Sequence, residues 1–279
     1  MKLLTARLLV AAALVATPAM LSAHRMWMLP SGTVFSGTDN WVTVDAAVSN
    51  DLFFFDHQPM RLDAVKVTQP DGSDGVVQNG ATGRYRSVFD VELDKPGTWK
   101  VGMQMAAVMG SFVIDCVEKR VGGRGGPPRP GQPPAIAVAD IPASATAVKL
   151  AEISSRNEIF VTAGAPTTTV FRPTGKGLEF APVTHPDELV AGEPATFRFL
   201  IDGKPAAGLK VAVIPGGKRY RNDEGAMNLT TGADGVLRVT WPAAGMYWLN
   251  ATATDAKTSV PRATERRMSY ITTLEVLTP

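Results

Sequence analysis

Short apolar stretches that alternate with polar residues recur along most of the chain. Segments 41–48, 64–69, 87–93, 98–105 and 111–117 alternate or are rich in β-branched and aromatic residues, and Gly, Pro, Asp and Asn separate them. A period of two residues is typical of β-strands that bury one face. Several short strands at this spacing predict an all-β protein built from sandwiches.

The second half of the chain has a strand rhythm of its own. Strand patterns occupy 194–217, 230–253 and 267–277, with turn residues between them. In the run MYWLNA, we expect Tyr247 and Leu249 to share one face of a strand. The order of strands and turns resembles that of a small prealbumin-like or immunoglobulin-like sandwich.

Two immunoglobulin-like or prealbumin-like β-sandwich domains are therefore predicted, one over 24–165 and one over 166–279. A stretch in the first domain, 121–134, holds five Gly and five Pro and predicts a flexible surface loop, because it cannot bury a core. For the stretch 146–164, we expect a helical turn at its start and a strand at its end.

The first 23 residues have the pattern of a secretory signal peptide. Lys2 and Arg7 precede a short apolar run, and Ala23 places a small residue at the cut. That run is too short to span a membrane. The mature chain is expected to begin at His24, with an earlier cut after Ala19 left open, and the protein is expected in the periplasm.

The charge balance and the cysteine content limit the partners and the disulfides that can be expected. The chain has 28 basic and 26 acidic residues, and without the two basic residues of the signal peptide the balance is 26 to 26. A balanced chain gives no reason to expect a nucleic-acid partner. The single Cys116 cannot form an internal disulfide, and a buried free thiol is expected there.

The three histidines of the chain, His24, His57 and His185, are the candidate metal ligands. A chain that begins at His24 offers an α-amino group and an imidazole to one ion. A second imidazole would complete a nitrogen-rich set that suits Cu(II) best, then Ni(II) and Co(II). Asp56 precedes His57 and could bind the metal or orient that ring. A solvated surface histidine is the alternative for His57 and for His185.

Two apolar features allow other roles. The aromatic run 53–55 cannot be buried on one strand face, so at least one Phe is expected to line a pocket or an interface. Met103 and Met105 alternate with Val101, which predicts core packing, although thioethers can bind Cu(I). The sequence holds no nucleophile elbow, phosphate loop or zinc helix motif.

Three segments carry a resemblance to a known family: A-H-x-x-W-x-x-P at 23–30, GLEFAPVTHPDEL at 177–189 and GEPATFRFLIDGKPAAGLKV at 192–211. Together they resemble a family of Gram-negative periplasmic proteins, originally a domain of unknown function. Its members are often labelled periplasmic component of a cobalt or nickel uptake transporter. The resemblance spans essentially the whole mature chain. It implies a periplasmic two-sandwich protein with a metal link and a transporter of the inner or outer membrane as partner.

The leading hypothesis is therefore a periplasmic protein that binds Ni, Co or Cu and assists metal uptake or handling. His24 would bind through its amine and ring, with His57 or His185 as the second arm. One alternative is a copper-dependent oxidative enzyme with an N-terminal histidine brace. The other is an interaction or adhesion module without a metal, because a sandwich fold does not fix a function.

Overall fold

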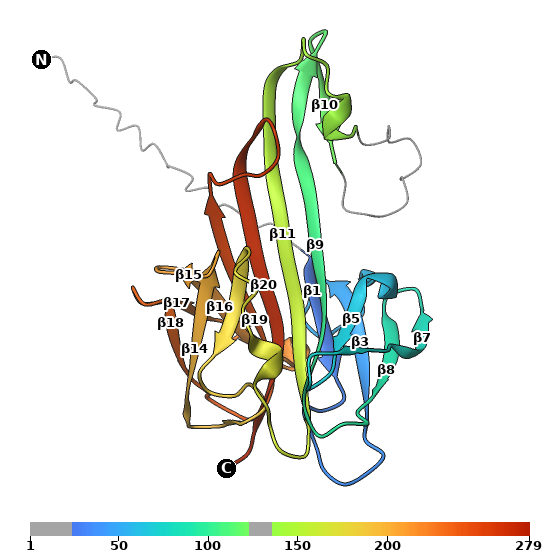
Figure 1. Cartoon of the computed structure of the whole chain (residues 1–279), viewed down its shortest axis with the longest axis vertical. Coiled ribbons are helices and arrows are strands. Elements are labelled where there is room, and N and C mark those ends of the chain that lie inside the picture. The colour runs from blue at the N-terminus through green and yellow to red at the C-terminus, as the bar shows by residue number, and fades with distance from the viewer. Residues whose placement is uncertain (1–23, 123–135) are drawn as a thin grey trace, which may run out of the picture.

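The computed structural model describes residues 24–122 and 136–279 as an almost purely β protein (Figure 1). The predicted signal peptide and most of the Gly/Pro-rich stretch lie outside these described residues. Within them, the helical parts are four single 3-10 turns, at Leu62–Ala64, Val138–Asp140, Thr169–Phe171 and Lys218–Tyr220. No helix in the described ranges is long and apolar enough to cross a membrane. The all-β prediction is confirmed.

The strands form three sheets. The first sheet has the order β1 (Arg25–Pro30), β3 (Trp41–Ser49), β8 (Ser87–Glu92) and β7 (Gln78–Thr82), with β4 (Gln58–Pro59) beside β3. The third sheet has the order β12 (Leu178–Pro182), β14 (Pro194–Ile201) and β15 (Lys204–Pro205), with β18 (Val236–Thr240) beside β14.

The central sheet is the largest. Its order is β17 (Met227–Thr230), β16 (Lys210–Pro215), β19 (Gly245–Asp255), β20 (Ala263–Leu277), β11 (Thr146–Ala163), β9 (Gly97–Ile114), β5 (Val65–Thr68) and β6 (Asp74–Gly75). Three short strands join it: β10 (Val117–Val121) on β9, β13 (Leu189–Val190) on β20 and β2 (Val34–Phe35) on β11. Because β11 pairs in parallel with β20, this sheet runs without a break from the first half of the chain into the second.

The central sheet carries a hydrophobic core on each of its faces. Ile159 and Phe160 are consecutive in β11, so their side chains point to opposite faces. Ile159 packs in a core with Phe89 of the first sheet, whereas Phe160 packs in a core with Phe197 of the third sheet. The first and third sheets therefore cover opposite faces of the central one, which makes two sandwiches that share a layer.

The face prediction for the second half is confirmed. Tyr247 and Leu249 alternate on β19, are 2% and 0% exposed, and belong to the same core. Met103 also follows its prediction, since it is half-buried and packs against the core of the first sandwich.

The strand predictions were wrong in two places. The segments expected as separate strands at 98–105 and 111–117 belong largely to the single 18-residue strand β9. The helical turn expected at the start of 146–164 is absent, since β11 is one 18-residue strand there. Its backbone is paired with β9 on one side and, from Leu150 on, with β20 on the other, and this long-range pairing overrides the local preference.

The expectation of a buried Cys116 was also wrong. Cys116 is exposed. It occupies the tight turn between β9 and β10 with a φ of 59°, and such hairpin turns lie at the surface.

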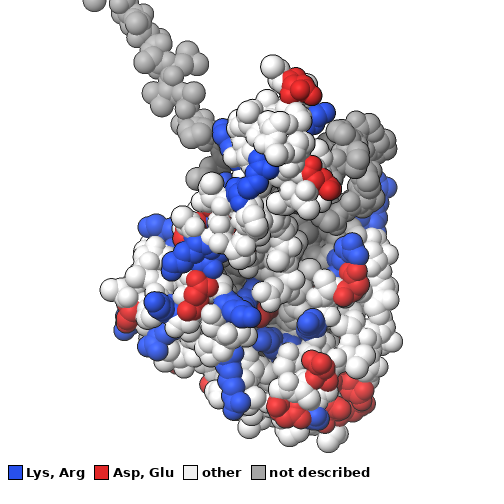
Figure 2. All heavy atoms as spheres, turned by 45° about the horizontal axis from the view of Figure 1, so that its top comes forward, with Lys and Arg blue, Asp and Glu red and all other residues white. Residues whose placement is uncertain are grey.

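Charges of both signs are interspersed on one face of the molecule (Figure 2). Figure 2 shows Lys and Arg side chains interspersed with Asp and Glu side chains on the face that it draws. This distribution agrees with the even balance of the sequence.

Candidate metal centre

The start of β1 is fixed between the two halves of the molecule. β1 pairs with β3 and also lies against β11 and β20 of the central sheet. The indole Nε1 of Trp248 in β19 donates a hydrogen bond of 3.0 Å to the carbonyl oxygen of Met26. Arg25 forms an ion pair with Glu224, and its guanidinium lies 5.7 Å from the centre of the Trp248 ring. The residues that follow His24 are therefore anchored to β3 in the first half of the chain and to Trp248 and Glu224 in the second half.

Two of the three histidines meet at this point. The rings of His24 and His57 are stacked with their centroids 3.6 Å apart and an interplanar angle of 15°. β1 and β4 flank β3 on its two sides, so the residues that precede β1 and β4 lie at the same end of β3. His24 is exposed and His57 is half-buried.

Hydrogen bonds shape the loop that carries His57. The carboxylate of Asp56 accepts two bonds from Asn50, at 2.9 Å from the backbone N–H and 3.2 Å from the side-chain amide. At the start of the loop, the Ser49 hydroxyl accepts a 2.6 Å bond from Trp27 Nε1 and donates a 2.5 Å bond to the carbonyl oxygen of Asp51. The Asp56 carboxylate therefore joins the end of the loop, next to His57, to Asn50 at the start of the loop.

The third histidine, His185, lies in a separate polar cluster. Its Nδ1 accepts a 3.2 Å bond from the backbone N–H of Asp187, so the ring proton is on Nε2 when the ring is neutral. Nε2 lies 3.0 Å from the Thr98 hydroxyl and 3.3 Å from the carbonyl oxygen of Thr167. Burial lowers the pKa of His185. Both ring nitrogens therefore have hydrogen-bond partners within the fold.

This polar cluster lies at the far end of β1 from His24. Its Thr162 hydroxyl contacts the Thr98 hydroxyl at 2.9 Å, and the Thr162 backbone N–H donates a 2.7 Å bond to the carbonyl oxygen of Thr33. The six residues of β1 separate His24 from that region, which corresponds to about 20 Å of extended chain. The structure does not bring His185 to the other two histidines.

The same cluster holds a buried carboxylate. Asp187 is 5% exposed, and its Oδ2 accepts a 2.6 Å bond from the Thr162 hydroxyl. Burial is the main cause that raises the pKa of Asp187 to about 7; the nearby Glu275 and Glu188 add to it, and the Thr162 bond opposes it. Asp187 is therefore partly protonated at neutral pH.

The His24–His57 pair has few other metal-ligating side chains around it. In residues 24–122 and 136–279, no three or more His, Cys, Asp or Glu side chains are grouped so as to hold a metal ion. The pair offers two imidazoles, and the α-amino group of His24 would be the third ligand in a chain that begins there. Metal–nitrogen bonds are about 2 Å long, so the stacked rings would have to turn for their lone pairs to converge on one ion.

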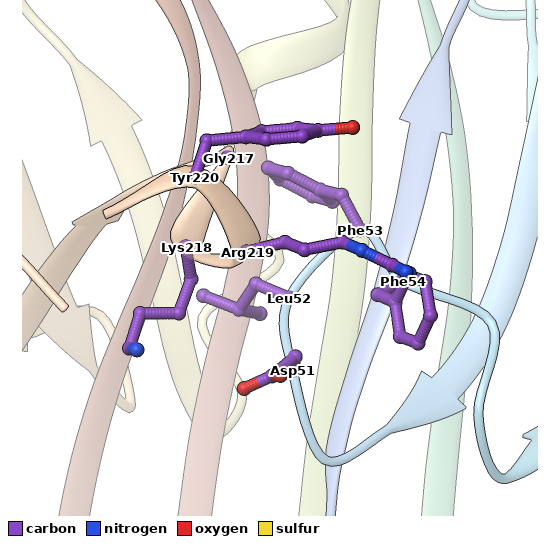
Figure 3. A pocket seen from close by; sticks show the side chains of 8 residues that line it. All are labelled: Asp51, Leu52, Phe53, Phe54, Gly217, Lys218, Arg219 and Tyr220. Atoms are coloured by element: carbon purple, nitrogen blue, oxygen red, sulfur yellow. The ribbon is translucent and has the colours of Figure 1, made fainter. Parts of the chain in front are cut away.

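A pocket of about 120 Å³ lies next to the loop that carries His57 (Figure 3). Phe53 and Phe54 line it, which confirms that the aromatic run lines a pocket. The guanidinium of Arg219 lies 4.6 Å from the centre of the Phe54 ring, and Tyr220 is 87% exposed. The sequence analysis missed Arg219 and Tyr220. They lie in the turn Lys218–Tyr220, and no local pattern connects this turn to the loop that carries Phe53 and Phe54.

The fold and the site define an all-β protein of sandwich architecture with a histidine pair at its N-terminal strand. The family model for a domain of unknown function, DUF4198, matches residues 21–255. The chain therefore belongs to the DUF4198 family. No curated protein matches it.

Solved structures show only distant likeness. The D0-D1 domain of intimin is 12% identical, with 89% of this chain and 97% of that chain covered and a TM-score of 0.21. A DUF4785 family protein from Legionella pneumophila is 9% identical, with 80% and 50% covered and a TM-score of 0.22. A marsupial T cell receptor is 9% identical, with 91% and 74% covered and a TM-score of 0.21. Scores this low carry no argument about function.

Proposed function

We propose that this DUF4198 protein is a periplasmic protein that binds a transition-metal ion through His24 and His57. The observation that carries the proposal is the 3.6 Å stacking of these two rings, which come from segments distant in sequence. The chain has only three histidines. Two of them meet at the first residue after a predicted signal peptide, which brings two imidazoles within reach of one ion once the stacked rings turn.

The donor set indicates the class of metal. The α-amino group and ring of His24 would close a chelate on one ion, and the ring of His57 would supply the third nitrogen. Three nitrogen ligands favour Cu(II), followed by Ni(II) and Co(II). Asp56 supports the site by holding the loop of His57 through Asn50, and β1 holds His24 through its anchors on Trp248 and Glu224.

The cellular role proposed for this site is metal uptake or handling, with a metal transporter of the inner or outer membrane as the partner. The sequence resemblance to proteins labelled as cobalt or nickel uptake components supports this role. A copper-dependent oxidative enzyme is the second candidate, because an N-terminal histidine and a second imidazole also form a histidine brace. Peroxide formation by the reduced, copper-loaded protein would favour the enzyme.

Calorimetric titration of the chain that begins at His24 with Cu(II), Ni(II) and Co(II) tests the proposal. We expect His57→Ala to weaken binding of the preferred metal by about 100-fold or more, since it removes a direct ligand. Acetylation of the His24 amine removes that ligand and should weaken binding as well. His185→Gln is the matched control and should bind like the parent protein. The proposal fails if the His57 variant and the acetylated chain bind as tightly as the parent.

A further inference from the structure

A second, larger cavity adjoins the pocket beside the His57 loop. Its volume is about 330 Å³, and Phe53 and Gly217 line both this cavity and the smaller pocket of about 120 Å³. Apolar side chains dominate its lining, which includes Leu29, Phe53, Pro215, Met246 and Tyr247. Small-molecule sites in proteins have volumes of about 300–1,000 Å³ and mostly apolar linings. The larger cavity therefore has the size and the lining of a ligand site.

The backbone of Phe53 is held in a conformation that bulky residues rarely adopt. Its φ is 58°, in the left-handed region. Packing holds the ring in place, because it lies edge-on to the Trp27 ring with the centroids 5.4 Å apart. On Gly216, an added Cβ would come within 2.8 Å of the Phe53 ring. Residues held in sparsely populated backbone conformations cluster at ligand sites. The fold thus fixes Phe53 as an aromatic wall of the larger cavity.

Arg221 is a cation at this cavity without an acidic partner. It lines the cavity, and its guanidinium donates hydrogen bonds to the backbone carbonyl oxygens of Gly216, Pro215 and Glu224. The Glu224 carboxylate pairs with Arg25 instead. In residues 24–122 and 136–279, no carboxylate forms an ion pair with Arg221, and its Nε has no hydrogen-bond partner. Carbonyl groups accept from some of its five N–H donors but do not neutralise its charge. An anion in the cavity would complement it.

The other charged residues around the two cavities favour the same sign of ligand. Lys218 and Arg219 line the smaller pocket together with one acidic residue, Asp51. Figure 3 shows Asp51 and Tyr220 on opposite sides of that pocket. Among the described residues, no acidic side chain lines the larger cavity. Clefts lined by an excess of one charge attract ligands of the opposite charge.

The larger cavity is open along the segment 243–245. Ala243, Ala244 and Gly245 line the cavity and are exposed. A Cβ added to Gly245 would meet no atom within 4 Å. A small ligand can therefore enter past these small residues without the displacement of a large side chain.

We propose that the larger cavity binds a small organic anion that has a flat apolar ring and a carboxylate group. The ring lies against Phe53 and Met246, since aromatic and thioether groups are favourable neighbours of an aromatic ring. The carboxylate pairs with Arg221, because a planar guanidinium matches the geometry of a carboxylate. The site uses none of the proposed metal ligands. It therefore goes beyond the proposed function and gives the protein an organic ligand as well as a metal ion.

Titration with 2-naphthoate and with its neutral analogue 2-naphthamide tests the proposal. Binding to the chain that begins at His24 is followed by ligand-observed NMR in the presence of a metal chelator, so the result does not depend on the metal centre. We expect the anion to bind about tenfold or more tightly than the amide, because a pair with a charged group is stronger than a neutral hydrogen bond. Equal affinities for the two probes, or no binding of either, would overturn the proposal.

Variants at the cavity locate the anion. Arg221→Gln should reduce the affinity for 2-naphthoate to that for the amide. Arg219→Gln is the matched control, because Arg219 lines only the smaller pocket, and it should keep the preference of the parent protein. A preference that survives in Arg221→Gln, or is lost in Arg219→Gln, would contradict the assignment.

Ala244→Trp is the second variant, for the case in which Arg221→Gln does not fold. Ala244 is exposed and lines the larger cavity, so an indole at this position fills the cavity without a change of charge. We expect it to weaken the binding of 2-naphthoate about tenfold or more. Binding as tight as that of the parent protein would overturn the proposal.

Discussion

Replacing the buried Asp187 by Asn should remove a strong pH dependence from the stability of the protein. The carboxylate is 5% exposed and accepts one hydrogen bond, from the Thr162 hydroxyl at 2.6 Å. Burial raises its pKa from 3.8 to about 7. Between pH 3.8 and about pH 7, the folded state therefore keeps a proton on Asp187 that the unfolded state has released. The associated stability is fully present below pH 3.8 and is lost as pH rises through about 7.

The size of the effect follows from the shift. A shift of about three pKa units at 1.36 kcal/mol per unit corresponds to about 4 kcal/mol over the full range. Between pH 5 and pH 8, the same two pKa values give a loss of about 2.5 kcal/mol. The amide that Asp187→Asn introduces does not titrate. We therefore expect the free energy of unfolding of the parent protein, minus that of Asp187→Asn, to fall by about 2.5 kcal/mol over this interval.

Urea unfolding of both proteins at several pH values between 5 and 8 measures this difference. The opposing titration of His185, whose pKa burial lowers, is common to both proteins and cancels to first order. Glu188→Gln is a control, because Glu188 is exposed and affects Asp187 only through its charge. Parallel pH profiles for the parent and Asp187→Asn would refute the reasoning.

Two further predictions concern Cys116 and Trp27. Cys116 is exposed in a turn, so a thiol reagent should label it in the folded protein as fast as in the unfolded protein; strong protection in the folded state would contradict its placement. Trp27 is 0% exposed and bonds to Ser49, so Trp27→Ala should lower the free energy of unfolding by about 3–5 kcal/mol in a urea titration. A loss below about 1 kcal/mol would show that β1 is not anchored as described.

Local patterns were sufficient for the strands that bury one face. Tyr247 and Leu249 alternate in the sequence and pack in one core, because a period of two residues places them on the same side of β19. The lengths of β9 and β11 could not be predicted in this way. Their outer parts are held by pairing with each other and with β20, which is distant in sequence.

The candidate site was predictable in its residue types and not in its geometry. His24 and His57 were singled out because the chain has few histidines and one follows a predicted cut. Their stacking depends on β1 and β4 flanking β3, which is a tertiary relation. No local signal separates His57 from His185.

Electron paramagnetic resonance of the Cu(II)-loaded chain that begins at His24 tests the central claim most directly. The nitrogen couplings of the spectrum count the ligands. We predict three nitrogens in the parent protein and in His185→Gln, and two in His57→Ala. A His57→Ala spectrum identical to that of the parent would contradict the claim that His24 and His57 share one metal ion.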